Sequence, residues 1–330
     1  MSRNIMIIGG GPGGVSAALA LHKAGLRPVI VERTGNLGGK AAAFGCKAAG
    51  RCVLCGACIV SAAVEEVAAA GIDTRFNTAV TAVRPAEGGF DVTLAGNARL
   101  AADGIIVATG HVNFNPSDHV EYGYATHPDI ITGYELEEMV RGRGGVRKRS
   151  DQAVPKTVAF IQCVGSREIF ACGNYCSVVC CKYALRFGAL LKHRDPACAV
   201  TLFVIDLQRG GKDFRPFHEE VRAGLTFVHG RPVVTAADRS GIMLKYKDET
   251  TGRMERRAFD MVVLATGIKV APQNAALADL LGLPLDADGF LAPHGRVQVA
   301  GTAGRPMSVA DAMRSGEAAA RALMREAVHA

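Results

Sequence analysis

A glycine-rich turn between an apolar segment and a helical segment constrains the fold of this chain more than any other feature. Residues 4–8 are apolar enough for a buried strand, and residues 12–24 have the pattern of a helix. The turn between them places Gly9, Gly11 and Gly14 in the spacing G-x-G-x-x-G. Glycines there permit a tight turn and a close approach of the backbone to a pyrophosphate, whose charge the helix N-terminus attracts. The start of the chain therefore predicts a dinucleotide site.

A carboxylate at the end of the next strand supports this interpretation. Residues 28–32 form a second predicted strand ending at Glu32, about twenty residues after the glycines, where a carboxylate can accept hydrogen bonds from ribose hydroxyls. Strand, turn, helix and strand in this order make the β-turn-α-β unit of a doubly wound parallel sheet. The predicted fold class is α/β.

The positions of further strands predict two domains. A second strand-turn-helix unit starts near residue 156, and a chain of 330 residues is long enough for two cores. We expect a first domain made of residues 1–112 and 269–330, and a second domain over residues 156–268. Residues 113–155, which are polar and rich in glycine and proline, are expected to connect them. The prediction is two Rossmann-like domains, one inserted in the other.

Composition and charge exclude several classes of protein. No apolar stretch of about 18 residues occurs, so we expect no membrane span, and the start of the chain has no leader pattern. The basic residues between Arg141 and Arg149 form either a solvated loop or a docking patch for an acidic partner. Nucleic acid is not expected as a partner, since no aromatic residues are interleaved and no recognition helix is evident. We expect a cytoplasmic protein, in which ten cysteines are more naturally metal ligands or catalytic thiols than disulfides.

The turn that opens the second domain carries cysteines instead of glycines. After the strand it reads Gln-Cys-Val-Gly-Ser-Arg over residues 162–167, without G-x-G-x-x-G, so the expected nicotinamide loop is absent from the sequence. Thiolate sulfur is a soft ligand that suits an iron-sulfur cluster or zinc. A helix over residues 176–192 would put Cys176 and Cys180 on one face, and Cys172 is a substitute candidate. An iron-sulfur cluster, a structural zinc site and ordinary buried thiols are the alternatives for the four candidate ligands Cys163, Cys176, Cys180 and Cys181.

Three further motifs resemble the two-dinucleotide-fold flavoprotein disulfide reductases, the group with a thioredoxin-reductase-like core. They are Gly-Gly-Lys at residues 38–40 and Ala-Thr-Gly at residues 108–110 and 265–267. The resemblance implies FAD in the first domain. Where that family has Gly-Asp, this chain has Gly301-Thr302, and a helix starting near Ser308 would direct its N-terminal dipole at the flavin. The residues implied in FAD binding are Gly9, Gly11, Pro12, Gly13, Gly14, Glu32, Arg33, Gly39, Lys40, Ala108, Thr109, Gly110, Gly301, Thr302 and Ser308.

The cysteine-bearing turn resembles one family within this group, the A subunits of heterodisulfide reductases. The resemblance is carried by Ile-Gln-Cys-Val-Gly-Ser-Arg at residues 161–167, Tyr175-Cys176 and Val-Cys-Cys at residues 179–181. It implies a [4Fe-4S] cluster bound by Cys163, Cys176, Cys180 and Cys181. The chain lacks the extra N-terminal region and ferredoxin domains of larger members, so we expect it to resemble the short form in heterodisulfide reductase-like complexes of sulfur-oxidising bacteria. The implied partners are B- and C-type subunits, a lipoate-binding protein and a second copy of the chain.

A second cysteine group leaves three interpretations open. Cys52, Cys55 and Cys58 are spaced like the start of a bacterial ferredoxin run, but the expected Cys-Pro is replaced by Ala62-Ala63. With Cys46 or a ligand from another subunit they would hold a second cluster. Otherwise Cys52 and Cys55 form a redox-active dithiol, or the thiols are inert.

The sequence thus predicts an oxidoreductase: an FAD- and [4Fe-4S]-containing electron-transfer subunit that relays electrons between flavin and partner subunits in sulfur metabolism. No general base or covalent nucleophile is needed for this role, so we predict no catalytic residue. A self-standing NAD(P)H-dependent dithiol-disulfide oxidoreductase using Cys52 and Cys55 is the first alternative. A non-catalytic assembly subunit is the second.

Overall fold

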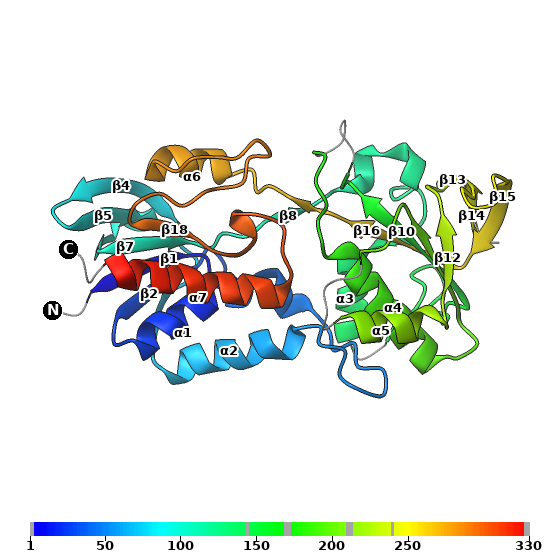
Figure 1. The fold of residues 1–330 in the computed structure, drawn as a ribbon, viewed down its shortest axis with the longest axis horizontal. Helices are drawn as coiled ribbons and strands as arrows, with labels where there is room; N and C mark the ends of the chain where they lie inside the picture. The colour runs from blue at the N-terminus through cyan, green and yellow to red at the C-terminus, as the bar shows by residue number, and fades with distance from the viewer. Residues whose placement is uncertain (1–2, 143–144, 168–172, 209–213, 239–240, 327–330) are drawn as a thin grey trace. The chain divides into compact units, whose positions relative to one another are not determined.

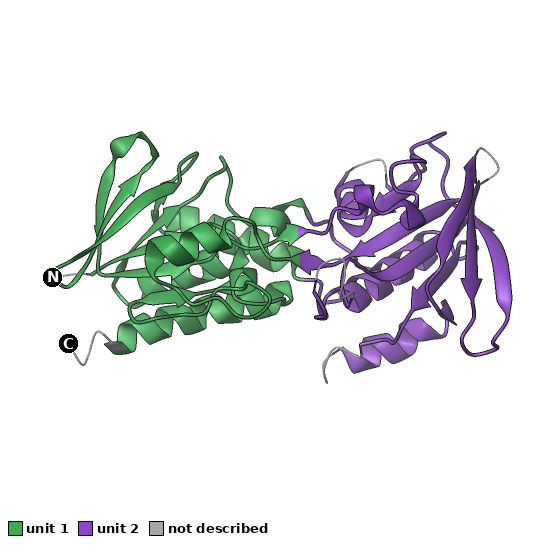
Figure 2. Ribbon diagram, turned by 90° about the horizontal axis from the view of Figure 1, so that it is seen from above, with its two compact units in different colours: residues 1–43, 56–112, 269–330 green, residues 44–55, 113–268 purple. Residues whose placement is uncertain are grey.

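The structure, a computed structural model, divides the chain into two compact units (Figure 2). It describes residues 3–142, 145–167, 173–208, 214–238 and 241–326. Unit 1 comprises Met1–Ala43, Gly56–Val112 and Lys269–Ala330, and unit 2 comprises Phe44–Cys55 and Asn113–Ile268. The chain enters unit 2 first over residues 44–55. It enters unit 2 again within the short strand β8 (Val112–Asn113) and returns to unit 1 within β17 (Ile268–Lys269).

Unit 1 is built on a parallel five-stranded sheet whose strands have the order β18-β7-β1-β2-β3 (Figure 1). Because side chains alternate along β1, the sheet of unit 1 has a hydrophobic core on each face. Ile5 and Ile7 pack with the helices on one face, whereas Met6 and Ile8 pack with an antiparallel meander on the other. The strands are β1 (Asn4–Ile8), β2 (Arg27–Val31), β3 (Asp73–Arg75), β7 (Gly104–Val107) and β18 (Val297–Val299).

Helices cover one face of this sheet, and the meander with one further helix covers the other (Figure 1). The helices of the first face are α1 (Pro12–Lys23), α2 (Ala57–Ala69) and α7 (Val309–Glu326). The second face carries β4 (Val80–Ala86), β5 (Gly89–Leu94), β6 (Arg99–Ala102) and α6 (Asn274–Leu281). Three short helical turns complete unit 1: η1 (Gly39–Ala43), η2 (Ala95–Asn97) and η5 (Gly301–Ala303).

Unit 2 repeats this arrangement with a parallel sheet in the order β12-β11-β10-β16-β9. Val158 and Phe160 of β10 pack under the helices, and Ala159 and Ile161 pack under a three-stranded antiparallel sheet. The parallel strands are β9 (Ile130–Thr132), β10 (Thr157–Val164), β11 (Ala199–Val204), β12 (Thr226–His229) and β16 (Met261–Thr266). The helices are α3 (Gly133–Arg141), α4 (Cys180–Arg194) and α5 (Arg215–Arg222). The antiparallel strands are β13 (Val233–Asp238), β14 (Gly241–Lys247) and β15 (Met254–Phe259). Two short helical turns are η3 (Pro116–Asp118) and η4 (Val120–Tyr122).

The predicted fold class, two Rossmann-like units of which one is inserted in the other, is confirmed, but the expected connection over residues 113–155 is not a plain linker. It contains β9, an edge strand of the unit 2 sheet, and α3, which packs in the same core. Helix α3 begins with a capping box, because Thr132 Oγ1 accepts from the Glu135 N–H at 3.2 Å and Glu135 Oε2 accepts from the Thr132 N–H at 2.7 Å. Residues 44–55 also group with unit 2.

The helix expected over residues 176–192 begins four residues later, at Cys180. The reason is local, since Val178 has a left-handed backbone with φ +54°, which a helix cannot continue through. Cys176 and Cys180 therefore do not share a helix face, and that part of the prediction is wrong. None of the helices in the described part of the chain combines the length and apolarity needed to cross a membrane.

Candidate functional site

The predicted FAD residues of unit 1 come mainly from loops at one edge of its sheet. Parallel strands end at the same edge, so the segments after β1, β2, β7 and β18 come together there. Those segments begin with Gly9, Glu32, Ala108 and Ala300. The glycine turn, the acidic residue, the first Ala-Thr-Gly and the Gly301-Thr302 pair are therefore neighbours at one place, as ligand sites of doubly wound sheets are.

The glycine turn is closely packed at two glycines and open at a third. A Cβ atom on Gly14 would lie 1.9 Å from the Gly9 oxygen, and a Cβ on Gly9, whose φ is +104°, would lie 2.5 Å from the Ala108 oxygen. A Cβ on Gly11 would have no protein atom within 4 Å. Gly9 and Gly14 are thus required by packing, whereas the space at Gly11 is left for a ligand.

Helix α1 and Glu32 complete a cradle for a pyrophosphate. Gly11 is the N-cap of α1 and makes no side-chain capping bond, so the first N–H groups of the helix have no side-chain acceptor at this cap. Glu32, which is buried, accepts from the Gly10 N–H at 2.8 Å and from the Thr34 N–H at 2.8 Å. The carboxylate therefore holds the turn in place, and its remaining lone pairs suit ribose hydroxyls.

Two cations lie beside this turn. The pKa of Lys40 is lowered, first by its partial burial and second by the charge of Arg33. Gly39, between them in the sequence, packs on the turn, since a Cβ there would lie 3.1 Å from the Gly11 Cα atom. Two like charges held near each other are stabilised by an anion such as a phosphate.

The remaining predicted FAD residues lie around Thr302. Its Oγ1 is 2.8 Å from His111 Nδ1, so the hydroxyl in the family's Asp position pairs with a histidine. The Thr109 hydroxyl is buried and has no hydrogen-bond partner among the described residues. Ser308 serves as a cap of α7, because its Oγ accepts from the Asp311 N–H at 3.2 Å. The open glycine, the uncapped helix, the paired cations and the orphaned hydroxyl all fit FAD.

The four predicted cluster ligands belong to unit 2 and lie around the start of α4. Cys163 ends the regular part of β10, Cys176 lies in the irregular segment before the helix, and Cys180 and Cys181 are its first two residues. Cys163, Cys180 and Cys181 are buried, and Cys176 is half-buried with its Sγ accepting from the Val178 N–H at 3.3 Å. Cys172, the substitute candidate, lies outside the described residues.

Two serines tie together the segments that carry these cysteines. Ser177 Oγ donates to Ser166 Oγ at 3.1 Å and accepts from the Ile268 N–H at 2.8 Å. Ser166 Oγ in turn donates to the Tyr175 oxygen at 2.9 Å. Both serines are buried, so water does not compete for these hydrogen bonds. The turn after β10, the segment before α4 and the start of β17 are thereby fixed to one another.

The backbone around the cysteines departs from ordinary geometry. Cys163, Arg167 and Val178 have φ of +61°, +60° and +54°, a left-handed conformation that is unfavourable for side chains other than glycine. Such conformations persist where the surrounding structure determines them, which is frequent at functional sites. A Cβ on Gly165 would lie 2.0 Å from the Phe114 ring, so an aromatic side chain fills the space beside the turn. The turn offers no open glycine like Gly11.

The four thiols influence one another's ionisation. Burial raises the pKa of Cys163 to about 11, and the nearby Cys181 and Cys176 also raise it. Burial raises the pKa of Cys180 strongly, followed by the influence of Cys163, Cys181 and Cys176. Buried thiols that oppose each other's ionisation are stabilised by a bound cation that takes them as thiolates.

Four cysteine thiols are a donor set that an iron-sulfur cluster takes. No three His, Cys, Asp or Glu side chains among the described residues form a group that could hold one metal ion. A [4Fe-4S] cluster binds each of four cysteines through a different iron atom, so its ligands need not converge on one point. The chemistry of Cys163, Cys176, Cys180 and Cys181 therefore fits the cluster that the sequence predicts.

Cys46, Cys52 and Cys55 of the second group lie on a segment that belongs to unit 2. Cys46 and Cys52 are exposed and Cys55 is half-buried. Arg186 of α4 donates to the Val53 oxygen at 2.9 Å and to the Leu54 oxygen at 2.8 Å, which anchors the segment near Cys55. Cys58 is exposed on α2 of unit 1.

An ion pair that the sequence analysis missed fixes the start of the same segment. Lys47 Nζ lies 2.5 Å from Glu137 Oε2, and both side chains are almost fully buried. The lysine also donates to the Gly45 oxygen at 3.0 Å and lies over the rings of Phe44 and Phe187. No local sequence pattern links a lysine to a glutamate ninety positions away, so only the tertiary structure reveals the pair.

Comparison with known proteins agrees with this geometry. Residues 4–66 match a sequence model of the family described as FAD dependent oxidoreductase. The chain is 39% identical over 239 residues to the A subunit of the H(2):CoB-CoM heterodisulfide,ferredoxin reductase of Methanothermobacter marburgensis, a match that covers 66% of this chain and 36% of the relative. This chain is related to the A subunits of heterodisulfide reductases. The iron-sulfur A subunit of the CoB-CoM heterodisulfide reductase of Methanocaldococcus jannaschii is 32% identical over 244 residues, with 68% of this chain and 37% of the relative covered.

The chain thus spans about a third of the length of these heterodisulfide reductase subunits. Solved structures bear out the fold. Thioredoxin reductase of T. acidophilum has a TM-score of 0.64 at 19% identity, covering 99% of this chain and all of that chain. Thioredoxin reductase of Lactococcus lactis has a TM-score of 0.62 at 16% identity, with both chains fully covered. The predicted family resemblance, the FAD cofactor and the oxidoreductase class agree with these findings.

Proposed function

We propose that this protein is the FAD- and [4Fe-4S]-containing electron-transfer subunit of a heterodisulfide reductase-like complex in oxidative sulfur metabolism. The observation that carries the proposal is the group of neighbouring thiols at Cys163, Cys176, Cys180 and Cys181, in the place where the first unit has its open glycine turn. When bound, FAD exchanges one or two electrons and an iron-sulfur cluster exchanges one at a time. A relay between two-electron and one-electron partners follows from that combination.

The residues of the chain have distinct tasks in this proposal. The turn at Gly11 and the start of α1 hold the pyrophosphate, with Lys40 and Arg33 neutralising its charge. Ser166 and Ser177 hold the cysteine-bearing segments in place, so that little reorganisation accompanies electron transfer. No side chain serves as a general base or a nucleophile.

The proposal includes partner subunits and a compartment. Relatives are named as A subunits, which supports assembly with other subunits. We propose that these are B- and C-type subunits, with a lipoate-binding protein and a second copy of the chain as further partners. The cysteines that the structure describes are free thiols, which supports a reducing compartment such as the cytoplasm. Affinity purification of the tagged protein from its native cells, followed by size-exclusion chromatography, tests this association.

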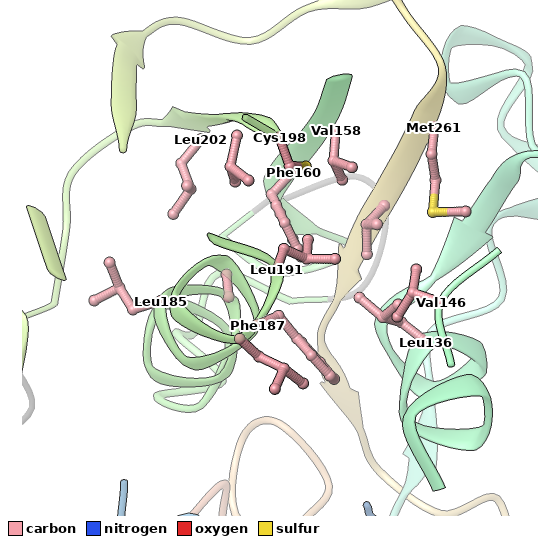
Figure 3. Packing of buried hydrophobic residues seen from close by; sticks show 14 of the residues in the cluster. Leu136, Val146, Val158, Phe160, Leu185, Phe187, Leu191, Cys198, Leu202 and Met261 are labelled. Atoms are coloured by element: carbon pink, nitrogen blue, oxygen red, sulfur yellow. The ribbon is translucent and has the colours of Figure 1, made fainter. Parts of the chain in front are cut away.

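Metal and flavin analysis tests the proposal directly. Anaerobically purified, reconstituted protein should contain flavin, iron and acid-labile sulfide, and its reduced form should give the EPR signal of a [4Fe-4S] cluster. The Cys181→Ala variant should lose iron and keep flavin. Cys198→Ala is the matched control, because Cys198 is equally buried but packs among apolar side chains of the unit 2 core (Figure 3).

Four outcomes would overturn the proposal. Protein with flavin but without iron or sulfide would exclude the cluster, and stoichiometric zinc would indicate a structural site. Rapid bleaching of the flavin by NADH or NADPH without any partner would indicate the self-standing dithiol oxidoreductase instead. Flavin and cluster that keep one redox state during turnover of the complex would indicate an assembly role.

A further inference from the structure

Two buried polar side chains near the cysteines have no hydrogen-bond partner among the described residues, although the serines around them are fully paired. They are Gln162, whose Nε2 and Oε1 are both unpartnered, and Tyr183, whose hydroxyl is unpartnered. A buried donor without an acceptor lowers the stability of the folded protein. Each such group therefore calls for an explanation, and a ligand that supplies the missing acceptor is one.

Gln162 faces the helix side of the unit 2 sheet. It is 3% exposed and directly precedes Cys163. Side chains alternate along β10, and Val158 and Phe160 lie on the face that α4 covers. Gln162 continues that alternation before the backbone turns at Cys163, so it lies on the face that α4 covers. Thr266 of the neighbouring strand pairs with Val164, two residues beyond Gln162, and its backbone oxygen is 3.8 Å from Cys180 Sγ.

Tyr183 lies on the same face and is held rigidly. It belongs to α4, one turn after Cys180, and packs edge-on against Phe187 with a centroid distance of 6.1 Å. A Cβ on Gly133 would lie 2.8 Å from its hydroxyl, so the ring rests directly on the start of α3. A phenol hydroxyl is a hydrogen-bond donor, and a spacing of three residues places Tyr183 on the same side of α4 as Cys180.

We propose that the Gln162 amide and the Tyr183 hydroxyl are hydrogen-bond donors to the sulfur atoms of the cysteine-bound cluster and raise its reduction potential. The inference rests on the proposed function. Thiolate and sulfide sulfur only accept hydrogen bonds, which matches the Nε2 and O–H groups that lack acceptors. Such bonds favour the reduced cluster because it carries more negative charge, and they are one determinant of cluster potential.

The test compares midpoint potentials of the cluster in three variants of the whole chain, by EPR-monitored redox titration. Tyr183→Phe and Gln162→Met remove the donors at similar volume. Each should lower the equilibrium constant for cluster reduction about tenfold, which is about 59 mV for one electron. Thr201→Val is the matched control, because Thr201 has a buried, unpartnered hydroxyl on β11 of the same sheet. Thr201 pairs with Ala159 and so lies on the opposite face, and its variant should keep the wild-type potential.

The outcomes separate this inference from the proposed function. Wild-type protein without iron and sulfide would overturn both. Bound cluster with unchanged potentials in Tyr183→Phe and Gln162→Met would overturn the inference alone. Folded variants that lose iron would assign the two side chains to cluster assembly, which also contradicts it. A shift in Thr201→Val as large as in the other variants would show that the potential responds to core packing in general.

Discussion

Ser177 Oγ donates to Ser166 Oγ at 3.1 Å and at the same time accepts from the Ile268 N–H at 2.8 Å. One fully buried hydroxyl therefore links the turn after β10, the segment before α4 and the start of β17. These are the segments on which the candidate cluster ligands and their neighbours lie.

The Ser177→Ala variant should be less stable and hold less iron. It leaves the Ile268 N–H buried without an acceptor, and the unfolding free energy should fall by about 1–3 kcal/mol. Urea unfolding and iron content measure both effects. Ser61→Ala is the control, because Ser61 is exposed on α2 and makes only a long 3.5 Å bond to the Ala57 oxygen. Equal stability of the two variants would contradict the role of Ser177.

Breaking the buried pair between Lys47 and Glu137 should destabilise unit 2. Lys47→Met leaves a buried carboxylate without its cation, at a cost of about 3–5 kcal/mol. A second substitution, Glu137→Leu, should recover most of that loss. Lys148→Met is the control, since Lys148 pairs with exposed Asp151 at 2.7 Å and its loss should leave unfolding unchanged. A double variant no more stable than Lys47→Met would contradict the pairing.

The cost of Lys47→Met should depend on pH with a defined sign. Burial raises the pKa of Glu137, whereas Lys47 lowers it, so removing the lysine raises it further. A carboxyl group with a raised folded-state pKa contributes stability below its unfolded-state pKa and loses that contribution as pH rises through the folded-state value. The destabilisation should therefore be smallest in acid and increase toward neutral pH. Unfolding curves at several pH values measure it, and a cost that falls with rising pH would contradict the prediction.

Two glycine substitutions should separate packing from cofactor binding in unit 1. Gly14→Ala places a Cβ 1.9 Å from a backbone oxygen, so it should disrupt the turn and the fold around it. Gly11→Ala meets no protein atom, so the protein should fold but bind FAD more weakly. Flavin content and thermal unfolding distinguish the two effects. Gly224→Ala, on an exposed position of unit 2 with only an ordinary 3.8 Å contact, should change neither. Full flavin occupancy in Gly11→Ala would place the cofactor elsewhere.

In metal-free protein, exposed cysteines should be alkylated faster than buried ones. Cys46, Cys52 and Cys58 are exposed and should react with iodoacetamide quickly. Cys180 and Cys181 are buried with raised pKa values, so little reactive thiolate forms at neutral pH. Mass spectrometry of the labelled peptides measures the order, with urea-unfolded protein as the control in which all thiols react. Fast labelling of Cys180 in the folded protein would contradict the burial.

Local sequence patterns were sufficient to predict structure where the residues concerned lie close together in the chain. The glycine turn, the strand before it and the acidic residue at the end of β2 predicted the first Rossmann-like unit, because strand, turn and helix signals occur within about thirty residues. The capping box at Thr132 and Glu135 was also visible in the sequence and would have revealed α3 within the expected connection. The late start of α4 was not visible, because it depends on a left-handed backbone at Val178 that no propensity favours.

By itself the sequence determined the fold class, the dinucleotide turn and the set of cysteines available for metal, since each depends on residue type and spacing along the chain. Tertiary structure alone decided that Ser166 and Ser177 join three separate segments and that Lys47 pairs with Glu137. It also decided that Gln162 and Tyr183 are buried with polar atoms that have no hydrogen-bond partner in the described part of the chain. Hydrogen bonds, ion pairs and burial are properties of atoms brought together from distant positions. They exist only after the sheet of unit 2 has set which strand ends lie side by side.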